Sequence, residues 1–288
     1  MENRITERVK IDFDPMRSLM YLNVNNEYYH KLDCWLHRVH VPESISQFGP
    51  YVTRYAFYKS LPIPEGSERF GVCNYQLTEH HWLVNPFSPQ LKIKTVQETM
   101  PLEVLKWEGL IPDEFDPEAS FSADEARGKE LADASEVPPL AWNFVPMWWE
   151  EEFKGEKRCA DDGDNFRWQF VVKYPDGVSK EEGDKWMLGE VLPKFAQMEE
   201  SVRILTSAVM QDVNASPFAR VVEIWFDLPR DWKTTALKKS STIQAPSWAS
   251  EGNCFPYLRP AFEIQSMFLS DMPTFDHLGQ YTGHITMR

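Results

Sequence analysis

The chain has 288 residues, of which 42% are hydrophobic and 26% charged, and its formal net charge is −14. This length allows two domains or one large domain, each with a core of its own. The excess of 44 acidic over 30 basic residues disfavours a nucleic-acid groove, which needs a concentrated basic face, and also disfavours binding to an anionic membrane surface.

Cysteine spacing and the N-terminal residues restrict the class further. The four cysteines lie far apart without a CxxC pair, so neither a disulfide framework nor a zinc site of the usual spacing is expected. Residues 1–14 are charged and lack the apolar run of a signal peptide. No stretch approaches the roughly 20 apolar residues that a membrane span needs. We therefore expect a cytoplasmic protein.

Aromatic residues are frequent, with 18 Phe, 11 Trp and 10 Tyr. Large rings dominate the buried area of a core, so core filling accounts for many of them. A chain this rich in tryptophan is also expected to line a ligand cavity with some of its rings.

The first half begins with an expected strand at residues 18–24, followed by a helix whose apolar residues recur at helical spacing. That helix should end near Pro42, because the residue before a proline avoids the α region. Further strands are expected at residues 51–58, 72–84 and 142–153, with a second helix at residues 96–107. The polar, acidic segment 112–139 is predicted to be an insertion.

A second polar break, residues 154–164, separates two aromatic-rich runs and favours a boundary between domains 1–155 and 165–288. In the second half, strands are expected at residues 166–174, 202–210, 220–227 and 257–269. Helices are expected at residues 184–193, ending near Pro193, and 231–238.

An internal repeat relates the two halves. Residues 33–42 (DCWLHRVHVP) align without a gap on residues 184–193 (DKWMLGEVLP), so that Asp, Trp and Pro coincide. The same order of elements, β-α-β-β-α-β, is expected around each segment, and this is the ferredoxin-like arrangement. The predicted fold class is α+β, with Trp35 and Trp186 at equivalent positions of their helices.

The residues after the first strand resemble those of a known family. Trp35, His40 and Pro42 form a W-x4-H-x-P pattern, and residues 49–55 (GPYVTRY) follow with an Arg-Tyr pair. This combination resembles the EthD-like branch of the dimeric α+β barrel superfamily, and the second half is similar but lacks the histidine. The resemblance covers about two-thirds of the chain.

The resemblance implies two four-stranded antiparallel sheets packed face to face, with helices outside and a pocket between or inside them. Two chains supply the two sheets in most relatives, whereas one chain would supply both here. Relatives include polyketide cyclases, cofactor-free monooxygenases and haem-containing dehydratases and lyases, so the fold alone does not determine function.

Comparison of the halves indicates that titratable side chains concentrate in the first. His40 corresponds to Val191, and Arg54 and Tyr55 fall opposite residues 204–206 (ILT). Matching on tryptophan places residues 79–82 (EHHW) opposite residues 222–225 (VEIW). A purely structural role does not need this asymmetry, although drift after duplication also produces it.

His40 is the best candidate for acid–base chemistry, because an imidazole titrates near neutrality. The structural alternative is a helix-terminal histidine that binds nearby carbonyls. His80 and His81 are neighbours on a strand and point to opposite faces, so one should face the pocket and the other the helices. Alternation alone does not decide which.

The remaining candidates would bind the substrate. Arg54 suits a planar carboxylate because its guanidinium offers two parallel donors. We assign catalysis to His40, His80, His81 and Tyr55, and substrate binding to Arg54, Tyr51, Tyr58 and Trp82. His37 and His40 lie three residues apart but lack a third ligand, so no metal and no other cofactor are expected.

The leading hypothesis is a cofactor-independent lyase of aromatic catabolism that acts on a small aromatic or phenolic acid by decarboxylation or elimination. The alternatives are a cyclase, a cofactor-free monooxygenase, a haem dehydratase, or a non-enzymatic binding protein. The expected partner is a small aromatic substrate, with no nucleic acid and no membrane; a homodimer is left open. His40, Arg54, Tyr55 and one of His80 and His81 are predicted to converge on one pocket.

Overall fold

The computed structural model describes residues 16–24, 26–27, 29–48, 51–83, 140–147, 151–155, 165–210, 216–249, 255–256 and 262–278. The helix expected at residues 96–107 and the acidic insertion at 112–139 lie outside the described residues.

The first sheet contains five antiparallel strands in the order β10-β2-β3-β1-β4. Four of them belong to the first repeat: β1 (Met16–Val24), β2 (Val52–Lys59), β3 (Gln76–Trp82) and β4 (Leu140–Met147). The fifth, β10 (Phe275–Asp276), comes from the end of the second repeat and pairs with β2.

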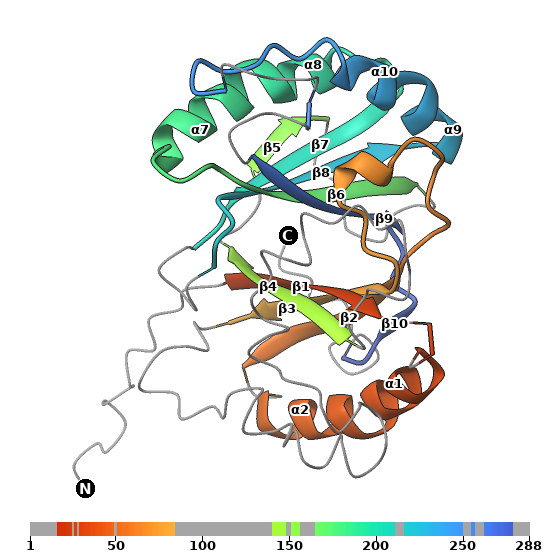
Figure 1. Cartoon of the computed structure of the whole chain (residues 1–288). Helices are drawn as coiled ribbons and strands as arrows, with labels where there is room; N and C mark the ends of the chain where they lie inside the picture. Colours follow the sequence, from red (N-terminus) through yellow and green to blue (C-terminus); the bar gives the residue numbers. More distant parts are fainter. Residues whose placement is uncertain are drawn as a thin grey trace, which may run out of the picture.

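The second sheet has the matching order β5-β7-β8-β6-β9. Its main strands are β6 (Phe166–Lys173), β7 (Ser201–Ala208), β8 (Arg220–Phe226) and β9 (Glu263–Ser270), and the edge strand is β5 (Glu151–Lys154). The two sheets face each other, and helices cover their outer faces (Figure 1). The expected α+β fold with two antiparallel sheets packed face to face is confirmed, but each sheet has five strands where four were expected.

Besides the short 3-10 helix η2 (Glu68–Phe70), the described residues form three longer helices, each with one wide π turn. The first consists of α1 (Tyr29–Trp35), η1 (Leu36–His40) and α2 (Val41–Phe48). The second consists of α7 (Lys180–Trp186), η4 (Met187–Val191) and α8 (Leu192–Ala196), and the third of α9 (Pro229–Asp231), η5 (Trp232–Ala236) and α10 (Leu237–Ser240). Within the described residues, no helix has the length and apolar character needed to cross a membrane.

The prediction that the first helix ends near its proline is wrong, because it continues six residues past Pro42 to Phe48. The second helix ends three residues past Pro193, at Ala196. A proline has no N–H and its ring collides with the carbonyl four residues earlier in a regular α-helix. Here a π turn precedes each proline, so Val41 donates to the Leu36 carbonyl and Leu192 to the Met187 carbonyl, five residues back. This wider turn opens the helix where the proline enters. Trp35 and Trp186 each end the α segment before the π turn, as predicted.

The single strand expected at residues 142–153 is also wrong, because the chain crosses between the sheets inside it. β4 ends at Met147, which bridges to Val209, and β5 then pairs with β7 of the second sheet. β10 makes the reciprocal crossing after β9. Each repeat therefore adds a strand to the sheet of the other, so that β10 covers the outer edge of β2 and β5 that of β7. The division into domains 1–155 and 165–288 stays a prediction.

The strand pairing defines which residues of the two repeats correspond. His81 lies opposite both Arg17 and Arg54, and Trp225 lies opposite both Arg167 and Arg203. The equivalent residues are therefore Arg17 and Arg167, Arg54 and Arg203, Glu79 and Glu223, His80 and Ile224, His81 and Trp225, and Trp82 and Phe226. Matching Trp82 to Trp225 from the sequence is wrong by one residue, and Arg54 has an arginine as its counterpart.

A loop of the first repeat also completes the second sheet. Beside β9, the backbone N–H of Cys73 donates to the Ser266 carbonyl at 2.8 Å, and the backbone N–H of Ser266 donates to the Gly71 carbonyl at 2.9 Å. Phe70 and Val72 join the apolar core of the second repeat. Gly71 has a φ of 59°, and a Cβ atom on it would lie 2.2 Å from the Ile264 carbonyl oxygen.

We expect Gly71→Ala to lower the free energy of unfolding by about 2–5 kcal/mol, because left-handed strain and a backbone collision add. Gly177 is the matched control, since its φ is 85° but no atom lies within 4 Å of the added Cβ. Gly177→Ala should cost about 1 kcal/mol. Urea denaturation measures both, and equal losses would contradict the close approach at Gly71.

Candidate functional site

The residues expected to form one site lie on two faces of the first sheet. Tyr55 and Trp82 pack with Val41 on the helix side, and His80 contacts both rings. Tyr58 instead packs against the second sheet. Because successive side chains of a strand point to opposite faces, Arg54 and His81 share the face of Tyr58. The predicted convergence on one pocket is therefore wrong, and the structure assigns His80 to the helix side.

The first helix contributes His40 and Ser44 to the helix side. His40 ends the π turn, and its ring stacks on Trp35 with centroids 5.1 Å apart and an interplanar angle of 17°. Ser44 Oγ lies 3.5 Å from His40 Nε2. His40 Nδ1 has no hydrogen-bond partner among the described residues. A buried polar atom of this kind can bind a ligand or a water molecule.

The sheet contributes four residues on the face that this helix covers: His80, Tyr55, Ser18 and Trp82. The rings of His80 and Tyr55 lie 4.2 Å apart. Ser18 Oγ accepts a hydrogen bond from Trp82 Nε1 at 2.9 Å and lies 3.4 Å from His80 Nδ1. His80 Nε2 is a second buried atom for which the described residues offer no partner. We call these four residues, with His40 and Ser44, the helix-side cluster.

Burial keeps both imidazoles of the helix-side cluster neutral. It lowers the pKa of His40 from 6.5 to about 4. Burial, followed by the nearby His40 imidazole, lowers the pKa of His80 from 6.5 to about 3. Burial also raises the pKa of Tyr55 above its ordinary value of 10.0, and the Ser44 hydroxyl opposes that shift. At neutral pH the site thus offers neutral groups that can both give and accept protons.

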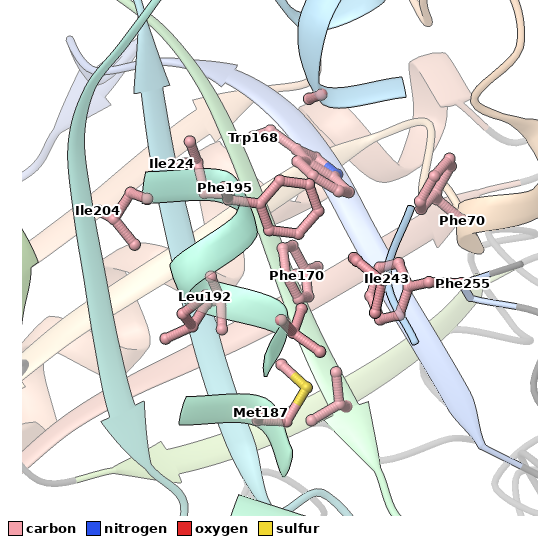
Figure 2. Close-up of a cluster of buried hydrophobic side chains, with 14 of the residues drawn as sticks. Phe70, Trp168, Phe170, Met187, Leu192, Phe195, Ile204, Ile224, Ile243 and Phe255 are labelled. Carbon is pink, nitrogen blue, oxygen red and sulfur yellow. The ribbon is translucent and has the colours of Figure 1, made fainter. Parts of the chain in front are cut away.

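The second repeat fills the same place with apolar side chains. Figure 2 shows Phe195 of the helix over Trp168, Ile204 and Ile224 of the sheet, and Phe195 meets Trp168 edge to face with centroids 5.6 Å apart. The corresponding residues, first repeat before second, are His40 and Val191, Ser44 and Phe195, Tyr55 and Ile204, His80 and Ile224, Ser18 and Trp168, and Trp82 and Phe226. The fold is therefore stable without these polar groups, which favours a functional role for them.

Between the sheets lies a charged network. Arg17 bridges the two sheets, because it binds Glu79 at 3.0 Å and also binds Glu223. Arg167 binds Glu223 at 3.3 Å, with its guanidinium carbon 4.4 Å from the centroid of the Tyr58 ring. Burial alone would raise the pKa of Glu79, but the Arg17 guanidinium, helped by the hydrogen bond with His81 and by Arg54, holds that pKa well below its usual range.

Three residues assigned to the site from the sequence, Arg54, Tyr58 and His81, belong to this network. Arg54 donates to the Tyr58 hydroxyl at 2.7 Å, and His81 Nε2 lies 2.7 Å from Glu79 Oε1. Arg54 and Glu79 recur as Arg203 and Glu223 in the second repeat. The presence of this arginine and glutamate in both halves favours a structural role for them. Fewer titratable residues are therefore specific to the first half than the sequence comparison indicated.

Sequence reasoning missed Ser18, Ser44 and the arginines of β1 and β6. Ser44 lies four residues after His40, a spacing that places both on one helix face. Ser18 lies opposite His80 in the register of β1 and β3, which only the pairing reveals. Tyr51 is partly buried against the helix-side apolar core. Among the described residues, no group of three or more His, Cys, Asp or Glu side chains is arranged to hold a metal; the expectations of no metal and no cofactor stay predictions.

The histidine pKa values predict acid sensitivity. The unfolded chain binds protons near pH 6.5, whereas folded His40 and His80 bind them only near pH 4 and 3. The unfolded state therefore takes up more protons as the pH falls below about 6.5, and stability declines until the folded pKa values are reached. We expect a loss of about 1–2 kcal/mol per histidine between about pH 7.5 and about pH 5.

Urea denaturation at both pH values tests this expectation. His40→Val combined with His80→Ile, which copies the second repeat, should remove most of the decline. The exposed His30 supplies the control, because His30→Gln should leave the decline unchanged. An unaltered decline in the double variant would contradict the assignment to these two residues.

The charged network predicts a large stability effect on the other face. Glu223→Ala leaves Arg17 and Arg167 without a shared carboxylate and should cost about 3–5 kcal/mol. Glu263 forms a partly exposed pair with Lys173 at 3.4 Å, so Glu263→Ala should cost less than about 1 kcal/mol. Chemical denaturation compares the two; similar small losses would show that the network does not hold the sheets together.

Comparisons with known proteins complete the description of the site. Residues 13–113 match the model of the chalcone isomerase N-terminal domain. No curated protein matches the sequence. An anthrone oxidase-like protein aligns with a TM-score of 0.43 and 10% identity over 92% of this chain and 93% of its own. A chlorite dismutase from Candidatus Nitrospira defluvii aligns with a TM-score of 0.45 and 6% identity over 94% of both chains. These likenesses are too distant to carry a functional argument. The EthD-like branch stays a prediction, since the matched model is a different one.

Proposed function

We propose that the helix-side cluster is the active site of a cofactor-independent enzyme that moves protons on a phenolic aryl ketone. The reaction would be an intramolecular elimination or its reverse, the ring-closing addition. The observation that carries this proposal is a polar, buried cluster at a place that the duplicate fills with apolar side chains. Residues 13–113, which match the chalcone isomerase N-terminal domain, contain all six residues of the cluster.

The location of Arg54 changes the earlier hypothesis of an acid substrate. Arg54 was expected to hold the carboxylate of a small aromatic acid, but it binds Tyr58 on the opposite face of the sheet. Decarboxylation therefore loses the residue that supported it. Elimination needs only proton transfer and a donor to an oxygen, which neutral histidines and a tyrosine supply. Of the alternatives named from the sequence, a cyclase is the one that also forms a ring within one substrate molecule.

The proposed chemistry conserves atoms without an oxidant or reductant. A chalcone joins two aryl rings through an unsaturated ketone. Removal of the proton from a phenol on one ring lets its oxygen add to the β-carbon, and negative charge then develops on the ketone oxygen. Protonation of the α-carbon completes an isomer with one new C–O bond. The reverse sequence is an elimination.

His40 is suited to carry the proton from the phenol to the α-carbon. Its buried imidazole is neutral at physiological pH, so it accepts a proton without prior ionisation. The phenolate that forms beside it favours the charged imidazolium and raises its pKa during the reaction. Trp35 holds the ring by stacking, and the apolar surroundings strengthen each polar contact with the substrate.

The proposal predicts that the protein converts a 2′-hydroxychalcone into its ring-closed isomer. The reaction is measured by the loss of visible absorbance that ring closure causes. His40→Ala should lower kcat by roughly 10²-fold or more, the scale of a lost proton-transfer group. His81→Gln is the matched control, because His81 lies on the same strand pair but faces the other sheet; its kcat should stay within about threefold of the wild type.

Two outcomes would contradict the proposal. Equal losses in the His40 and His81 variants would separate activity from the helix-side cluster. Tight chalcone binding without turnover in the wild type would instead support the alternative of a non-enzymatic binding protein. Circular dichroism and the unfolding midpoint establish that each variant is folded.

A further inference from the structure

Three polar residues of the helix-side cluster form a chain that ends on His80. Trp82 Nε1 donates to Ser18 Oγ at 2.9 Å, and Ser18 Oγ lies 3.4 Å from His80 Nδ1. All three side chains are buried, and Ser18 is 0% exposed. His80 Nε2, at the far end of the chain, has no partner among the described residues.

The direction of the chain determines where the His80 proton lies. An indole nitrogen can only donate, so Ser18 Oγ is the acceptor of its bond with Trp82. The hydroxyl proton of Ser18 then needs an acceptor, and His80 Nδ1 is the one that the described residues provide. If Nδ1 were protonated, that hydroxyl proton would be buried without an acceptor, at a cost in free energy. The satisfied arrangement has Nδ1 as acceptor and the proton on Nε2.

The second repeat shows that the fold does not require this chain. Trp168, Ile224 and Phe226 occupy the places of Ser18, His80 and Trp82, and all three are buried. Each link is therefore replaceable by an apolar side chain in the same architecture. Because the fold does not need Ser18 and Trp82 as hydrogen-bonding groups, we look for their role in the orientation of the His80 Nε2–H donor.

We propose that Trp82 and Ser18 fix the tautomer of His80, so that its Nε2–H is a preset donor to the substrate oxygen on which negative charge develops. This inference rests on the proposed function and adds a division of labour to it. His40 would move the proton, while His80 would stabilise the developing enolate. Ser18 and Trp82 are positioning residues, since they act through His80. A donor oriented before the reaction needs no reorganisation when the charge appears.

The low pKa of His80 is consistent with this role. Because burial holds it at about 3, the imidazole stays neutral over the physiological range. A neutral ring has one donor and one acceptor nitrogen, so the neighbouring hydroxyl can specify which nitrogen donates. A protonated ring would donate from both and would not depend on Ser18.

Nitrogen-15 NMR of histidine-labelled, ligand-free protein tests the tautomer directly. The His80 signals, assigned by their loss in His80→Gln, should show a protonated Nε2 and an unprotonated Nδ1. Ser18→Ala should shift this pattern toward the other tautomer or a mixture. Ser266→Ala is the matched control. Ser266 of the second repeat is also fully buried, but its hydroxyl donates to the Phe70 carbonyl and not to a histidine. A wild-type proton on Nδ1 would overturn the proposal.

Kinetics with a 2′-hydroxychalcone test the role of the donor. Ser18→Ala should lower kcat by about tenfold with little change in KM, because the loss occurs as charge develops. Trp82→Phe, which copies Phe226, should have a smaller effect in the same direction. His80→Gln keeps an N–H donor and should retain more activity than His80→Phe, which should lose about 10²–10³-fold. Equal losses in Gln and Phe variants would refute a donor role.

The two readouts separate this inference from the proposed function. The NMR pattern needs no substrate, so it remains decisive if no chalcone is turned over. If NMR shows the expected tautomer but no chalcone is turned over, the enolate role of His80 is refuted. The proposed function is then refuted separately, by the turnover assay. Turnover that depends on His40, combined with a proton on His80 Nδ1, would refute the tautomer while the proposed function stands.

Discussion

The central strands of the two sheets are covered on both faces along the residues that the structure describes, and that constraint determines how their side chains are used. Antiparallel sheets often leave one face in water, but here one face packs on helices and the other on the second sheet. All seven residues of β8 are buried, and β6 has one residue in eight that is not. Polar side chains on such strands need partners within the protein or in a ligand. The clusters on the two sides meet this need differently.

Between the sheets, the need is met by ion pairs that both repeats supply. Arg17 reaches a carboxylate on each sheet, and Arg167 shares Glu223 with it. The arrangement is close to symmetric, because each sheet contributes equivalent arginines and a glutamate. On the helix side the symmetry is broken. The second repeat has a largely apolar core there, while the first places two histidines, two serines and a tyrosine at the corresponding positions. Ion pairs from both repeats thus connect the two sheets, whereas the helix-side cluster belongs to the first repeat.

Much of the fold was predictable from the sequence, because the repeat and the strand pattern are local signals. Trp35 and Trp186 marked equivalent helices, and the eight expected strand regions all contain strands. The prolines did not mark helix ends, because a π turn accommodates a proline within a helix. Nothing in the local sequence distinguishes that turn from a helix end. The crossing after Met147 was also hidden, because the hydrophobic pattern continues while the pairing partner changes.

The candidate site was harder to predict, because a one-residue error in register reverses every side chain. His40 was found from its place after Trp35, and alternation showed that His80 and His81 must separate. Choosing between them required the contacts of Tyr55 and Trp82. Arg54 was misassigned because it lies 12 residues after Pro42, whereas its counterpart Arg203 lies 10 residues after Pro193. The duplication of this arginine was therefore not visible in the ungapped alignment.

The exchange of β5 and β10 has a consequence for how the protein is made. A ribosome delivers the first repeat before the second, and domains of most proteins fold as they emerge. Here the first sheet receives its edge strand only after β9 has been synthesised, so the outer edge of β2 lacks its partner during most of translation. An unpaired strand edge is a template for association with other chains. Biosynthesis of this chain therefore passes through a stage in which protection of β2, by a chaperone or by rapid completion, decides the yield of folded protein.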